Sequence, residues 1–185
     1  NHVMMLESDS GAFRPLGFGF SGSARSRSVV TDIATLLAGI DAGSVSLADV
    51  QVGGSIAVNG ACLTATRLDG NAFAADVSRE TLTLTTLGSA VPGTPVNIEK
   101  ALLAGQALGG HYVTGHIDGV GNVISRHDDA RSVRVEFEVP DELARYVARK
   151  GSICVDGVSL TVNGVNGRRF DVNLVPHTLE LTTLA

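Results

Sequence analysis

The chain has 185 residues, of which 44% are hydrophobic and 18% are charged, and its formal net charge is −5. This balance supplies enough apolar side chains for a packed core and is the opposite of that of disordered chains. The sequence has no basic stripe, which argues against nucleic-acid binding. No apolar run approaches the roughly 18 residues that span a bilayer, and residues 1–27 lack the apolar stretch of a secretion signal. We therefore expect neither a membrane segment nor export.

The cysteines and the common motifs exclude several kinds of site. Cys62 and Cys154 form neither a CxxC pair nor any other metal-ligand spacing, so we expect no metal site and no disulfide framework. Dinucleotide, nucleotide-triphosphate, hydrolase and zinc-protease motifs are absent, and no redox cofactor site is evident. A chain of this kind is expected in the reducing cytoplasm.

The sequence contains an internal repeat. Residues 52–88 align without a gap with residues 149–185, at an offset of 97, and 15 of the 37 paired positions are identical. This is far more identity than unrelated segments share. The duplication predicts two similar domains, because two copies are too few for a solenoid.

Each copy has the pattern of a β-hairpin followed by a return strand. In chain order the first copy predicts strands at Ser55–Val58, Cys62–Leu68 and Asn71–Val77. Because side chains alternate along a strand, Cys62 and Thr64 should lie on the same face of the second strand. The second copy repeats this pattern.

Four turn dipeptides separate these strands, namely Asn59-Gly60, Asp69-Gly70, Asp156-Gly157 and Asn166-Gly167. Asn-Gly and Asp-Gly favour type I′ turns, in which both central residues have a positive φ. About six short strands per copy would close into a small barrel, which leaves no exposed edge. The sequence therefore predicts an all-β fold of two similar six-stranded barrels.

Helices are minor in this prediction, and the two copies differ at their ends. Short helices are expected at Ala101–Leu108 and, with proline in its first turn, at Pro140–Arg149. Ile117–Val120 is predicted to open the second barrel. The first copy continues into a strand at Pro95–Glu99 that has no counterpart in the second copy, so we expect a second barrel that is truncated at its C-terminus.

Four blocks resemble riboflavin synthase of the alpha-chain type. They occur in the family's order within residues 29–185. They are Ser55–Leu63 (SIAVNGACL), Glu99–His116, which ends in GGHYVTGH, Lys150–Thr161 (KGSICVDGVSLT) and Pro176–Leu184 (PHTLELTTL). Several separate blocks on one duplicated framework are more specific than any single block.

The resemblance implies a fold, an assembly and a reaction. It implies two Greek-key barrels per chain, a homotrimer and a dismutation without a cofactor. Two molecules of 6,7-dimethyl-8-ribityllumazine exchange a four-carbon unit, which gives riboflavin and 5-amino-6-(ribitylamino)uracil. One substrate lies on the first barrel of one subunit and the other on the second barrel of a neighbour. Lumazine synthase is a further partner that the resemblance suggests.

The predicted domains are residues 29–110 and residues 111–185, with residues 1–28 as an atypical N-terminal extension. The sequence departs from the family in two places. The family's opening strand, phenylalanine-threonine-glycine, is displaced or lost, because Phe20-Ser21-Gly22 is separated from Val29 by SARSRS. The family's C-terminal strand and trimer-forming helix are also missing. Trimerisation and catalysis of this chain are therefore open questions.

Two pairs of repeat-equivalent residues are the first candidates for the site. Cys62 and Ser159 share one repeat position and would give one pocket a thiol and the other a hydroxyl, an asymmetry that suits donor and acceptor roles. Thr64 and Thr161 lie two residues further on and could bind the pyrimidine edge of each ligand. The alternative for all four is an ordinary strand residue, small or β-branched.

His111 and His116 lie five residues apart, so on a strand their side chains would point to opposite faces and would not share a metal. His116 matches the family's pocket histidine, and histidine is the side chain that exchanges protons near neutral pH. We therefore assign His116, Cys62, Ser159 and Thr161 to catalysis, with bound water or hydroxide as an alternative base. His111 is assigned a structural role.

The remaining expected contacts follow from the resemblance. In the segments Asp76–Thr81 and Val175–Glu180 the backbone groups are expected to bind the heterocycle. The complete set of predicted substrate-binding residues is Cys62, Leu63, Thr64, Asp76, Val77, Ser78, Arg79, Glu80, Thr81, Gly115, His116, Ile117, Lys150, Ser159, Leu160, Thr161, Val175, Pro176, His177, Thr178, Leu179 and Glu180.

Two other functions remain open for this sequence. One is a non-catalytic lumazine- or flavin-binding protein on the same duplicated barrel, and the other is an inactive fragment. The presence of Cys62, His116, Ser159 and Thr161 together favours the enzyme. A likeness of fold alone would not decide between them.

Overall fold

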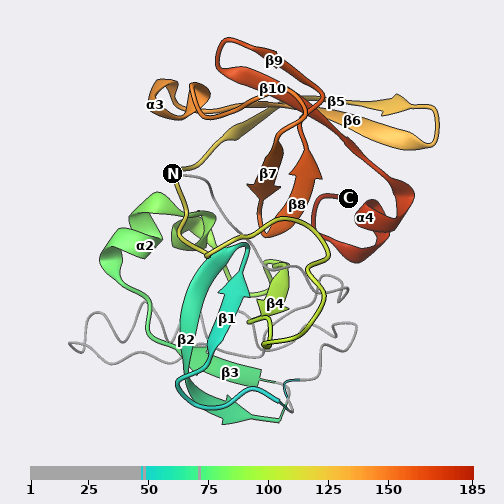
Figure 1. The fold of residues 1–185 in the computed structure, drawn as a ribbon. Helices are drawn as coiled ribbons and strands as arrows, with labels where there is room; N and C mark the ends of the chain where they lie inside the picture. Colours follow the sequence, from blue (N-terminus) through green and yellow to red (C-terminus); the bar gives the residue numbers. More distant parts are fainter. Residues whose placement is uncertain (1–46, 48, 71) are drawn as a thin grey trace.

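The computed structural model describes residues 47, 49–70 and 72–185 (Figure 1). The predicted N-terminal extension, residues 1–28, lies outside the described residues. The elements of the first half are β1 (Ser55–Val58), β2 (Ala61–Asp69), β3 (Ala72–Ala75), α2 (Arg79–Leu84), the 3₁₀ helix η1 (Thr86–Ser89) and β4 (Ile98–Lys100). Those of the second half are β5 (Asn122–Asp129), β6 (Ser132–Glu138), α3 (Asp141–Ala144), β7 (Ser152–Val155), β8 (Val158–Thr161), β9 (Gly164–Asn166), β10 (Arg169–Leu174) and α4 (Pro176–Leu181).

The first module consists of β1 to β4 with α2 and η1, and the second consists of β5 to β10 with α3 and α4. The strands of the first module form an antiparallel sheet with the order β3-β2-β1-β4. Its core contains Ile56 and Val58 of β1 and alternate residues of β2, and the intervening residues Cys62 and Thr64 are exposed. This alternation confirms the predicted faces of β2. The alternation ends where the register shifts between Ala65 and Arg67. This bulge turns the Arg67 side chain outward, where strict alternation would have buried it.

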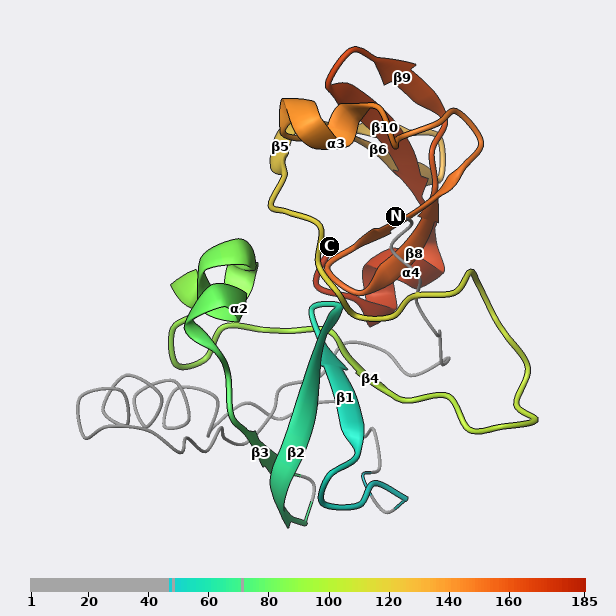
Figure 2. The ribbon, with the colours of Figure 1, turned by 60° about the vertical axis from the view of Figure 1, so that its left-hand side comes forward.

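The second module contains a sheet with the order β5-β6-β10-β9 and the hairpin β7-β8. Phe137 and Phe170 stack in its core with ring centroids 5.3 Å apart, beside the fully buried Val172. Figures 1 and 2 show the two modules as separate groups of strands, with the β1–β2 hairpin directed at the β7–β8 hairpin. The predicted all-β fold of two similar modules with short helices is confirmed.

The two hairpins have the same register. Ala57 pairs with Cys62 in the first module, and Cys154 pairs with Ser159 at the equivalent position of the second. In the turns, φ is 46° at Asn59 and 79° at Gly60, and the corresponding angles are 45° at Asp156 and 86° at Gly157. Two positive values in succession are those of a type I′ turn, which confirms the prediction for this pair of turns.

The type I′ prediction was wrong for the other two dipeptides. The register pairs Asp69 with Ala72 and Asn166 with Arg169. Glycine is therefore the first of the two central residues of each turn, not the second. Only the glycine of each dipeptide has a positive φ, 58° at Gly70 and 59° at Gly167.

Three predictions outside the hairpins were also wrong. Residues 101–108 form no helix, because Gly105 has a φ of 90° and the segment has no packed apolar face. The helix predicted at Pro140–Arg149 is limited to α3. The residues that follow form i→i−3 bonds, such as Tyr146 N–H to Leu143 O at 2.9 Å, so the chain continues in tight turns. Residues 117–120 are not a strand, and the first strand of the second module is β5.

Two short helices, α2 and α4, were not predicted from the sequence, and they are related by the repeat offset of 97. Ser78 caps α2, because its Oγ accepts a bond from the Thr81 N–H at 3.0 Å. Pro176 lies in the first turn of α4. Both residues are recognised start signals, but each helix has only six residues and shows no apolar periodicity.

The modules meet at the tips of the two equivalent hairpins. A Cβ on Gly157 would lie 2.9 Å from the backbone nitrogen of Gly60, so the turns touch where both residues are glycine. The buried Asn97 joins them: its N–H donates to Asn59 Oδ1 at 2.8 Å and its Nδ2 donates to the Asp156 carbonyl at 2.7 Å. The Thr183 N–H also donates to Asn97 Oδ1 at 2.9 Å.

We expect Asn97→Ala to lower the free energy of unfolding by about 3 kcal/mol, because it leaves several partners in the junction without their bonds. Urea unfolding measures the change. Asn122→Ala, at an exposed position of β5, is the matched control and should cost less than about 0.5 kcal/mol. Equal stability of the two variants would contradict the role of Asn97 in joining the modules.

Candidate functional site

The predicted catalytic positions lie on the outer faces of the two hairpins. Cys62 and Thr64 of β2 are exposed, while Leu63 between them is buried. Ser159 of β8 is half-buried and Thr161 is exposed. The repeat therefore presents a thiol and a hydroxyl at equivalent positions of the two modules.

The connecting segment brings Gly115 against Cys62. The Cys62 N–H donates to the Gly115 carbonyl at 2.9 Å. Gly115 has a φ of 75°, and a Cβ there would lie 2.8 Å from the Cys62 nitrogen, so this close approach requires glycine. His116, which is exposed, follows directly and is thereby attached beside the strand that carries Cys62.

The same segment reaches the second hairpin through a side chain. His111 Nδ1 lies 2.7 Å from Ser159 Oγ, a hydrogen bond between two half-buried groups. His111, for which the sequence predicted a structural role, thus lies among the residues around Ser159. Lys150 is exposed and has a φ of 62°, and its N–H donates to the Val162 carbonyl at 2.8 Å.

The two segments expected to bind the heterocycle lead into α2 and α4. Asp76 is exposed and Val77 is buried, and Arg79 and Glu80 lie in the first turn of α2. In the second module Val175 is the N-cap of α4, and Pro176, His177, Thr178, Leu179 and Glu180 lie within that helix. Each segment is therefore extended first and helical afterwards.

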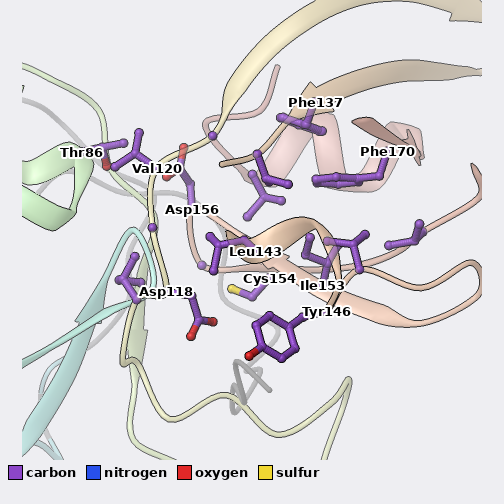
Figure 3. Close-up of a pocket in the computed structure, with 18 of the residues that line it drawn as sticks. Thr86, Asp118, Val120, Phe137, Leu143, Tyr146, Ile153, Cys154, Asp156 and Phe170 are labelled. Carbon is purple, nitrogen blue, oxygen red and sulfur yellow. The ribbon is translucent and has the colours of Figure 1, made fainter. Parts of the chain in front are cut away.

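A pocket of about 240 Å³ lies in the second module and opens toward the first. Phe137 and Phe170 lie on one side of it, and Asp118, Tyr146 and Cys154 on the other (Figure 3). All four residues of β7 line it, together with Asn59, Thr85 and Thr86 of the first module. Of the predicted substrate-binding residues, Ile117 alone is among the described residues that line this pocket.

Asp156 is an ionisable group at the junction of the two modules. It lies in the β7–β8 turn and lines the pocket, and its backbone carbonyl accepts from Asn97. Burial raises the pKa of the Asp156 carboxyl above its ordinary value, because desolvation disfavours the charged form. The equivalent residue of the first module is the neutral Asn59.

In the described ranges, no group of three or more His, Cys, Asp or Glu side chains is arranged to hold a metal ion. Among the helices of the same ranges, none is both long and apolar enough to span a membrane.

Several residues of the site and the junction were missed from the sequence. The repeat offered a signal for two of them: Thr86 and Thr183 are identical at the offset of 97, and both lie next to the junction. The sequence indicated only a structural role for His111 and none for Asn97. The partner of His111 lies 48 residues away, and the hydrogen-bond partners of Asn97 lie 38, 59 and 86 residues away.

The sequence matches the lumazine binding domain twice, over residues 26–101 and 114–185. LumP complexed with 6,7-dimethyl-8-(1'-D-ribityl) lumazine has a similar structure, with a TM-score of 0.66, 25% identity and coverage of 75% of this chain and 73% of that one. LumP complexed with riboflavin is similar at a TM-score of 0.66 and 28% identity, with coverage of 74% and 73%. The fold and the repeat thus define the class of proteins that contain two copies of the lumazine binding domain.

Comparison with curated relatives identifies a narrower family within this class. The chain is 45% identical to riboflavin synthase of Mycobacterium bovis over 168 residues, which is 88% of this chain and 82% of that protein. It is 44% identical to riboflavin synthase of Photobacterium phosphoreum over 146 residues, 79% of this chain and 67% of that protein. The chain therefore belongs to the lumazine-binding domain family and, within it, to the riboflavin synthases.

We expect Gly115→Ala to lower the free energy of unfolding by about 2 kcal/mol, because the new Cβ would overlap the backbone of Cys62. Gly105→Ala is the matched control, since Gly105 also has a positive φ, of 90°, but a Cβ there meets nothing within 4 Å. Urea unfolding of both variants separates overlap from backbone strain. An equal loss in both variants would show that the approach to Cys62 does not constrain this position.

We expect Asp156→Asn to be more stable than the wild type at pH 7. Because the pKa of Asp156 is raised, the folded state binds the proton more tightly, and wild-type stability falls as the pH rises from about 4 through the raised pKa. The advantage of the variant should therefore vanish as the pH is lowered toward about 4. Thermal unfolding across this range measures it, with the exposed Asp69→Asn as a control. A difference independent of pH would contradict the prediction.

Proposed function

We propose that the chain catalyses the dismutation of two molecules of 6,7-dimethyl-8-ribityllumazine to riboflavin and 5-amino-6-(ribitylamino)uracil. The observation that carries this proposal is the equal register of the β1–β2 and β7–β8 hairpins, which present Cys62 and Ser159 at equivalent positions. Kinship with riboflavin synthases over both modules supports it.

A duplicated fold suits a reaction between two copies of one compound. Each barrel binds one molecule, with Thr64 or Thr161 at the pyrimidine edge and backbone groups of the segments before α2 and α4 at the heterocycle. The sites must differ, because one molecule donates a four-carbon unit and the other accepts it. The two sites differ in this way, because the first carries the thiol of Cys62 and the second carries the hydroxyl of Ser159. Both reactants are the same compound, so the proposed exchange calls for no further cofactor.

Catalysis in this proposal has two sources. Holding two substrates face to face converts a bimolecular encounter into a reaction within one complex. The second source is removal of a proton from the acidic ring methyl, a step that we assign to His116 or to a water or hydroxide beside it.

The assembly is part of the same proposal. We infer a homotrimer in which the first barrel of one subunit, residues 29–110, faces the second barrel of a neighbour, residues 111–185. Lumazine synthase is the proposed partner, and the cytoplasm is the proposed location.

The test is to incubate the purified chain with 6,7-dimethyl-8-ribityllumazine and to follow riboflavin absorbance and fluorescence. Riboflavin formed above the rate without protein supports the enzyme. Saturable binding without turnover would instead support a lumazine- or flavin-binding protein, a second candidate favoured by the similarity to LumP. Neither binding nor turnover would overturn both.

We expect His116→Ala to lower kcat by roughly 100-fold, the usual contribution of a positioned acid or base. Lumazine binding should change far less, because the assigned role lies in the reaction step. His127→Ala, on the exposed strand β5, is the matched control and should retain full activity. Unchanged kcat in the His116 variant would assign the proton transfer to another group.

A further inference from the structure

The segment 111–116 makes different contacts at the two equivalent positions of the repeat, Cys62 and Ser159. At Cys62 it contributes a backbone group, since the Gly115 carbonyl accepts the Cys62 N–H at 2.9 Å. At Ser159 it contributes a side chain, since His111 Nδ1 lies 2.7 Å from Ser159 Oγ. The two hairpins match in register, so this contact is a difference between the modules that the repeat itself does not contain.

His111 is held in place by its neighbours in the chain. Val113, two residues on, is 5% exposed and anchors the segment in the core. Gly115, four residues on, is fixed to β2 by its bond with Cys62 and by an approach that tolerates no Cβ. A side chain anchored in this way loses little conformational freedom when it makes its hydrogen bond.

The chemistry of the pair concerns the direction of the hydroxyl. A serine hydroxyl rotates freely and can donate once and accept twice, so its direction is set by its partners. The His111 Nδ1 atom at 2.7 Å occupies one of these donor or acceptor positions of the hydroxyl, and the remaining positions point in other directions. Ser159 thereby has a defined donor or acceptor direction for a ligand on the outer face of β8.

We propose that His111 is a positioning residue that orients the Ser159 hydroxyl toward the heterocycle bound on the second barrel, and that it thereby makes this site different from the one at Cys62. The inference rests on the proposed function, whose substrate it places in contact with Ser159. His111 acts through Ser159 and takes no part in the proton transfer assigned to His116.

The test compares His111→Leu, which removes the hydrogen bond, with His111→Asn, whose amide can replace the Nδ1 group. We expect His111→Leu to weaken binding of 6,7-dimethyl-8-ribityllumazine to the second barrel by about five- to tenfold, the value of one hydrogen bond. His111→Asn should restore most of the affinity. Amide NMR shifts at Ser159–Thr161 report the second barrel, and those at Cys62–Thr64 report the first, where the affinity should be unchanged.

A double-mutant cycle separates positioning from a structural role. Ser159→Ala should weaken binding to a similar extent, and His111→Leu added to Ser159→Ala should weaken it no further, because the two residues act as one unit. Thermal unfolding of all variants accompanies the cycle. His127→Leu, on exposed β5, is the control for loss of a histidine.

The possible outcomes are distinct. Additive losses in the double variant, equal weakening at both barrels, or failure of His111→Asn to restore affinity would each overturn the positioning role. Equal affinity of His111→Leu and the wild type would overturn it as well and leave the proposed function standing. If the wild-type chain binds no lumazine, the proposed function and this inference fall together.

Discussion

The contact between two equivalent hairpin turns is the constraint on which the arrangement of the molecule depends. Gly60 and Gly157 approach so closely that a side chain on either would strike the backbone of the other turn. Asn97 bonds to both turns and is the buried polar residue of the described chain. Its backbone directly precedes β4 and its amide reaches across to Asp156, so a single residue bonds to both modules.

This junction also determines where the linking segment can run. With the hairpins held tip to tip, residues 111–116 pass between β2 and β8 and contact both, through Gly115 at Cys62 and through His111 at Ser159. This single segment therefore gives Cys62 and Ser159, which are equivalent in the repeat, different surroundings. Such a difference is what a reaction between two molecules of the same compound requires.

The repeat made much of the fold predictable, because hairpins depend on local chemistry. The dipeptides correctly predicted positive φ at Asn59-Gly60 and Asp156-Gly157, and alternation along β2 placed Cys62 and Thr64 on its outer face. The same dipeptide types failed at Asp69-Gly70 and Asn166-Gly167, where the strand register decides which residues are central in the turn. The helices were predicted poorly. Elements of four to six residues carry little periodicity, and their ends depend on capping bonds and on the path that the chain must take to the next strand.

From the sequence alone we predicted the duplication, the β class, the two matched hairpins and the repeat equivalence of Cys62 and Ser159, since each of these depends on local turn chemistry or on identity between the copies. What surrounds these features depends on the tertiary structure. The bonds of Asn97 to Thr183 and of His111 to Ser159 span 86 and 48 residues, and Asp156, whose pKa burial raises, lies in the turn that contacts the first module. Contacts between distant residues depend on how the modules pack, and no local pattern encodes that packing.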